Sequence, residues 1–192
     1  PNRYIDRTKF YKINELQPNN AEVQIIGKVV HWRTVESAQQ KGMRLVATFV
    51  DETGQMELVW FKGIKWISDT LKLNEPYVIF GRLNHFGNTF SMPHPEMDLL
   101  VDFNKAGYSS IQPVYPSTEK LAKRNISNRV MRQLIHTLFE EVGTTFAENL
   151  PENLLNALNL IGKQEAMLNI HFPTTQAMLT KATVRLKFEE LF

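Results

Sequence analysis

Residues 77–96 read YVIFGRLNHFGNTFSMPHPE, and this stretch decides the predicted fold of the first half of the chain. Val78 and Phe80 recur at alternate positions, as side chains on one face of a half-buried strand do. Gly87 and Asn88 both tolerate a positive φ, which a tight turn requires. The stretch therefore predicts two strands that turn back on each other.

The tip of this predicted hairpin is unusually apolar. Phe86 and Phe90 flank the turn, and His85 lies beside them in the sequence. A hairpin tip normally faces water, so large aromatic side chains there need a functional reason. We expect the tip to be part of a binding surface.

Three strands and a short helix are predicted before the hairpin. The strands are expected at residues 22–33, 43–51 and 55–62, and the helix at residues 64–73. Together with the hairpin, this order is typical of an OB-fold, a five-stranded Greek-key barrel. Gly27 inside the first strand predicts a bulge or a sharp bend, which small barrels need. Another small barrel or a meander remains the alternative.

The composition changes after Pro95, and the second half of the chain has a helical pattern. Residues 99–112 carry Gly, Ser and Asn and are predicted to form a connector, and residues 113–116 (PVYP) a rigid turn. Apolar residues then recur at helical spacing, and no strand is predicted. We expect an OB-fold with an N-terminal extension over residues 1–100, and a linker with a helical segment over residues 101–192. The fold class is a β-barrel plus α-helices.

The composition also excludes several kinds of function. None of the 192 residues is Cys, so the chain has no disulfide and no cysteine nucleophile, which fits a reducing cytosol. No apolar run approaches the roughly 20 residues that cross a bilayer. The five His residues show no metal-ligand spacing, no phosphate-binding loop occurs, and the carboxylates form no convincing pair. We therefore predict no catalytic residue, no metal and no cofactor for this chain.

Basic and aromatic residues near the presumed binding side favour a nucleic acid, although the net charge of +2 is too small to indicate one by itself. OB-folds bind oligonucleotides through strands two and three and two loops, here residues 34–42 and 85–89. Bases stack on exposed aromatics at roughly 1–3 kcal/mol each, while Lys and Arg neutralise phosphates. One of Trp60 and Phe61 must point into the barrel, because successive strand residues face opposite sides. The predicted contact residues are Phe86, Phe90, His85, Arg82, Arg33, Lys41, Arg44 and Lys62.

Six segments, in this order and spacing, carry a family resemblance. They are YIDRT (4–8), GKVV (27–30), the hairpin from Gly81 to PHPE (93–96), PVYPSTE (113–119), IHFP (170–173) and RLKFEELF (185–192). Together they resemble the wedge region of the RecG family of bacterial ATP-dependent branched-DNA helicases, over essentially the whole chain.

The resemblance implies a function. In that family the wedge is an OB-fold at the branch of a stalled replication fork or Holliday junction, and it splits the strands while a two-lobed motor pulls the duplex. Tip aromatics stack on the base pair exposed at the branch point. Phe86 and Phe90 match that role by position, with Arg82 and His85 beside them. The family further implies DNA repair and recombination in the cytoplasm, associated with the nucleoid.

The motor's phosphate loop and Mg²⁺ motif are absent from this sequence. We therefore expect a fragment that neither hydrolyses ATP nor unwinds DNA by itself, with branched DNA and the motor domains of the same full-length chain as its partners. ATP and Mg²⁺ would belong to that motor. Two alternatives remain: an OB-fold that binds RNA, as anticodon-binding domains do, and a protein-interaction barrel.

Overall fold

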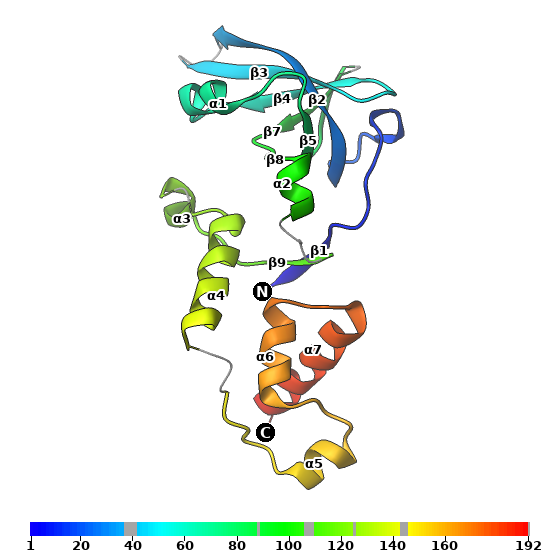
Figure 1. Cartoon of the computed structure of the whole chain (residues 1–192), viewed down its shortest axis with the longest axis vertical. Helices are drawn as coiled ribbons and strands as arrows, with labels where there is room; N and C mark the ends of the chain where they lie inside the picture. Colours follow the sequence, from blue (N-terminus) through cyan, green and yellow to red (C-terminus); the bar gives the residue numbers. More distant parts are fainter. Residues whose placement is uncertain (37–41, 88, 106–109, 125, 143–145, 192) are drawn as a thin grey trace. The chain divides into compact units, whose positions relative to one another are not determined.

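The computed structural model describes residues 1–36, 42–87, 89–105, 110–124, 126–142 and 146–191, which fall into two compact units (Figure 1). The barrel unit is Lys9–Tyr108, and the helical unit joins Pro1–Thr8 to Ser109–Phe192. Within the described part of the chain, no helix is both long and apolar enough to cross a membrane.

The barrel unit is built on one seven-stranded sheet. Its elements are β2 (Glu22–Glu36), β3 (Met43–Val50), β4 (Gln55–Trp60), α1 (Ile64–Thr70), β5 (Pro76–Arg82), β6 (Asn84–Phe86), β7 (Thr89–Pro93), β8 (Glu96–Leu99) and α2 (Leu100–Lys105). The strand order is β6-β7-β4-β3-β2-β5-β8, with β7 parallel to β4 and the other neighbours antiparallel. Strands β2, β3, β4, β5 and β7, with a helix after the third, form an OB-fold. The predicted fold class is confirmed.

The hairpin differs in detail from the prediction. Its arms are the short strands β6 and β7, whereas β5 pairs with β2 and β8. Leu83 separates β5 from β6, because its N–H donates to the carbonyl of Ala21, 2.9 Å away. Residues 77–96 thus belong to four strands, and the tight turn lies in the middle of the stretch, at Gly87 (φ 58°) between β6 and β7.

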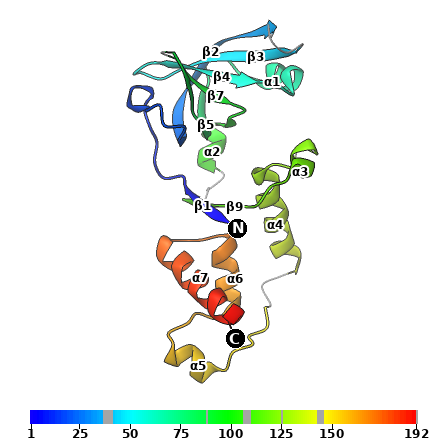
Figure 2. The same cartoon turned by 180° about the vertical axis from the view of Figure 1, so that it is seen from behind.

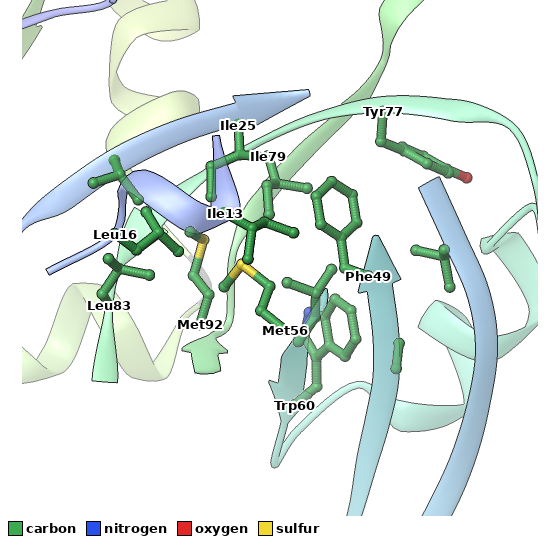
Figure 3. Close-up of a cluster of buried hydrophobic side chains, with 14 of the residues drawn as sticks. Ile13, Leu16, Ile25, Phe49, Met56, Trp60, Tyr77, Ile79, Leu83 and Met92 are labelled. Atoms are coloured by element: carbon green, nitrogen blue, oxygen red, sulfur yellow. The ribbon is translucent and has the colours of Figure 1, made fainter. Parts of the chain in front are cut away.

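The core of the barrel consists of the side chains that point inward from its strands. Figure 3 shows Phe49, Ile79, Met56 and Trp60 gathered together with the Met92 side chain from β7. All of these side chains are buried, and burial of each large apolar side chain stabilises a fold by about 1.5–3 kcal/mol. The core therefore fixes which side of β3 and β4 faces outward.

Gly27 is needed for close packing rather than for the predicted bulge or bend. A Cβ at this position would lie 2.4 Å from the carbonyl oxygen of Val50 and 2.6 Å from the Phe49 ring. The bulge of β2 lies farther along, where the register shifts between Val29 and His31. A sequence pattern gives no sign of such an approach, because Phe49 lies on another strand.

The first residues of the chain belong to the helical unit and not to the barrel, contrary to the predicted boundary. Strand β1 (Arg3–Asp6) pairs antiparallel with β9 (Ile111–Val114), and the Tyr4 hydroxyl donates to the carbonyl of Ile170, 2.7 Å away. Two further expectations were wrong as well. The predicted connector contains the last residue of β8, all of α2 and the start of β9, and the first half of the predicted rigid turn is the end of strand β9. Nothing local predicts β9, since its partner strand lies about a hundred residues away.

The helical unit contains five helices among its described residues. They are α3 (Glu119–Lys123), α4 (Asn128–Val142), α5 (Glu152–Ala157), α6 (Lys163–His171) and α7 (Gln176–Leu191). Helices α6 and α7 pack against each other, as both views show (Figures 1 and 2).

An ion-pair network joins α7 to the start of α6. The fully buried guanidinium of Arg185 donates to Glu148 (2.6 Å) and to Glu189 (2.9 Å). The Glu148 carboxylate also accepts the backbone N–H groups of Lys163 and Leu150. Burial by itself raises the pKa of Glu148, but these N–H groups and the guanidinium hold it at about 2.

Replacing Gly27 by Ala should destabilise the barrel by about 1–3 kcal/mol, because the added methyl group overlaps a backbone carbonyl that cannot move easily. Urea unfolding followed by circular dichroism would measure the loss. Val30→Ala, in the half-exposed bulge of the same strand, should cost much less. Equal losses for both variants would contradict the packing argument.

The stability of the helical unit should fall as pH is lowered through the acidic range. The pKa of Glu148 in the folded state lies below its unfolded value of about 4.3, so its stabilising contribution is complete above that value and is lost as pH falls toward 2. Urea unfolding at a series of pH values would measure the dependence. Glu148→Gln should flatten it, and an unchanged slope in this variant would contradict the assignment.

Candidate nucleic-acid interface

The outward-facing side chains of neighbouring strands lie side by side, because the strand register places them in rows that cross the sheet. On β3 the core takes Leu45, Ala47 and Phe49, so Arg44, Val46 and Thr48 point the other way. Because neighbouring strands place register partners on the same side, the whole outward surface can be followed from strand to strand.

We call this surface the outer face. One row consists of His31, Thr48, Glu57, Ser91 and Asn84, and the next of Arg33, Val46, Val59 and Pro93, in which the two valines are buried. Phe86 and Thr89 lie beyond the first row, at the hairpin end. Arg44 and Val35 lie beyond the second row, at the opposite end.

Phe86 is the most exposed aromatic of the predicted site. Its side chain is 89% exposed at the tip of β6, next to Gly87, and faces the same side as Asn84. An exposed ring contributes none of the free energy that burial of an apolar side chain provides. A partner that covers the ring would gain this free energy on binding.

Phe90 has a different position from the one expected of a second platform at the tip. It is partly buried and packs against the barrel core, and its ring centroid lies 4.9 Å from that of His85, its register partner. Phe86 and Phe90 lie on opposite sides of the hairpin. Phe86 pairs with Thr89 and shares its side, and Phe90 follows Thr89 in β7, so it points the other way. Phe90 therefore anchors the hairpin, and His85 covers its ring.

The predicted basic residues are only partly brought together. Arg33, Arg44 and Lys62 are exposed on the outer face or at its end, and Arg33 makes an ion pair of 3.3 Å with Glu57. Arg82 ends β5 opposite Glu22, on a different part of the barrel surface. Lys41 lies outside the described residues.

Phe61 is an exposed aromatic that the predicted contact residues did not include. Trp60 is buried in the core, so the next residue points outward, and Phe61 is 55% exposed beside Arg44. His94 holds it: the Phe61 N–H donates to Nε2 of His94 over 3.2 Å, and the two ring centroids are 5.7 Å apart. Burial and the nearby Lys62 lower the pKa of His94, which favours the neutral imidazole that an accepting Nε2 requires. The alternation after Trp60 was the signal that could have found it.

The described residues contain no cluster of three or more His, Asp or Glu side chains that could hold a metal ion. The outer face instead offers exposed rings at its two ends and guanidinium or ammonium groups between and beside them. This arrangement suits stacking and phosphate contacts.

A family model described as the RecG wedge domain matches residues 1–140. Over its whole length the chain is 29% identical to the ATP-dependent DNA helicase RecG of Thermotoga maritima and 27% identical to that of Synechocystis sp.. It covers 24% of each, so it spans about a quarter of the length of these relatives.

A solved structure agrees with the sequence matches. The structure of RecG bound to a three-way DNA junction aligns with all of this chain and 25% of that chain, with 27% sequence identity and a TM-score of 0.73. The family model alone covers well over half of the residues, and it confirms the resemblance found in the six segments. The chain belongs to the RecG wedge domain family.

Proposed function

We propose that this chain is the branched-DNA-binding wedge of an ATP-dependent DNA helicase that acts on stalled replication forks and Holliday junctions. The wedge splits the strands at the branch point. The observation that carries this proposal is the nearly complete exposure of Phe86 on the hairpin of an OB-fold.

A branch point offers a surface that fits such a ring. In continuous duplex each base pair is covered by its neighbours, but at a fork the last pair exposes a flat aromatic face. Stacking on a base is worth about 1–3 kcal/mol and needs no particular sequence. Phe86 can therefore distinguish a branched from an unbranched duplex without reading bases.

Phosphate contacts supply the rest of the affinity. Arg33, Arg44 and Lys62 lie along or beside the outer face, where a strand that leaves the tip would pass. Binding through these groups falls steeply as salt rises, because each contact releases counterions from the DNA. Glu57 opposes this attraction, and its ion pair with Arg33 ties up one of the cations.

The motor that this function needs is assigned to the rest of the full-length protein. The relatives are ATP-dependent DNA helicases about four times as long as this chain. We propose that residues 101–192 lead to that motor, and that ATP and Mg²⁺ are used there. The residues of this chain would hold and divide the DNA, in the repair and recombination of bacterial DNA.

Phe86→Ala should remove most of the preference for branched DNA. The affinity for a fork should fall by about five- to a hundredfold, toward that for a duplex of equal length, because one stacking contact is lost. Fluorescence anisotropy at two salt concentrations would measure both affinities. The unfolding curve should not change, since the ring is exposed.

Two comparisons make this test decisive. Leu73→Ala removes another half-exposed apolar side chain of the barrel unit and should leave the fork preference unchanged. If Phe86→Ala keeps the full fork preference, the stacking role is wrong. If structured RNA displaces the fork at equal concentration, the RNA-binding alternative is favoured instead.

Glu57→Gln should strengthen binding to forked DNA by about two- to fivefold at low salt. The change removes a carboxylate that repels phosphates and releases Arg33 for a phosphate contact. Glu75→Gln, which removes the same charge from an exposed loop, is the matched control. Equal effects of the two variants would indicate a general charge effect and no local path over the outer face.

A further inference from the structure

We propose that Phe61, braced by His94, is a second base-stacking platform, which receives an unpaired base of a single strand that crosses the outer face from Phe86. The inference rests on the proposed function, because the branch held at Phe86 would deliver that strand. It extends that function by assigning the path of one strand and the residues at its far end.

Phe61 is held in place before any ligand binds. Its backbone N–H donates to Nε2 of His94, and the backbone N–H of His94 donates to the carbonyl of Val59, 2.8 Å away. The two rings lie 5.7 Å apart at 46°, so the imidazole supports the phenyl ring, which is still 55% exposed. A ring fixed in this way loses little conformational freedom when a base stacks on it.

The charges around Phe61 fit the backbone of a strand. Lys62 follows it directly, and Arg44 precedes Leu45, the register partner of Trp60. Both basic side chains are exposed. One ring for the base and two cations for phosphates form the combination that single-strand-binding OB-folds use.

The distance between the two platforms fits a short single strand. Phe86 pairs with Thr89, and the parallel register of β7 with β4 places Thr89 level with Gln55. Phe61, directly after the end of β4, lies six positions beyond Gln55, about 20 Å along the strand direction at about 3.3 Å per residue. Roughly four to six nucleotides cover this distance, at the low end of the site sizes of OB-folds.

The surface between the platforms can carry such a strand. The partly or fully exposed side chains of the first row are small or polar, among them Thr48, Ser91 and Asn84, whereas Val46 and Val59 in the second row are buried. Its acidic residue, Glu57, is paired with Arg33. Duplex DNA offers no unpaired base to Phe61, so the ligand is a single strand.

The test uses forked DNA in which one arm is single-stranded, with lengths from zero to about eight nucleotides and with either strand polarity. For the unmodified chain, affinity should rise with arm length and level off at about six nucleotides. Phe61→Leu, which keeps an apolar side chain without a ring, should lower affinity for the long arms by about fivefold or more. It should leave forks with arms of zero to about two nucleotides unaffected. Phe61→Tyr should retain the affinity, and Leu73→Ala should behave as the unmodified chain does.

The outcomes separate the two proposals. If Phe61→Leu matches the unmodified chain at every arm length and polarity while Phe86→Ala loses fork preference, the second platform is wrong and the wedge function stands. If the chain shows no fork preference but Phe61→Leu still weakens binding of single-stranded oligonucleotides, the platform stands without the wedge. Absence of any nucleic-acid binding overturns both.

Discussion

The barrel depends on one strand serving two sets of partners. Strand β2 pairs with β5 from Glu22 to Lys28 and with β3 from Lys28 onward, so it changes partners at Lys28. Gly27, next to this point, permits the close approach of β3, because a Cβ there would meet the carbonyl of Val50 and the Phe49 ring. The register of β3, and through it that of β4 and β7, follows from this packing.

That register determines which side chains the barrel offers to a ligand. A shift by one residue would exchange the inward and outward sets on β3 and β4, burying Arg44 and exposing Leu45. Trp60 and Phe61 show the same constraint at the end of β4, since one fills the core and the other reaches solvent. The binding surface is therefore a consequence of core packing, and substitutions inside the barrel can alter it.

The hairpin divides two tasks between its aromatic residues. Phe90 and the His85 ring over it fix the β6–β7 ribbon to the core, while Phe86 stays free at the tip. A rigid support matters for an exposed platform. If the tip moved freely, ordering it on binding would cost conformational entropy, and this cost would offset the free energy gained by stacking. Phe61 and His94 repeat this arrangement of a supported ring at the other end of the outer face.

Local signals in the sequence, alternation and turn residues, predicted the first three strands of the barrel, the short helix after them, the OB-fold and the apolar hairpin tip. The sequence also required that either Trp60 or Phe61 point inward. That Phe86 is free and Phe90 anchored follows from strand pairing across the turn, which becomes visible in the folded chain. Only the tertiary structure decided the β1–β9 pair, the packing role of Gly27 and the contact of Phe61 with His94, 33 residues away. These features join residues far apart in the chain, and no local pattern records such contacts.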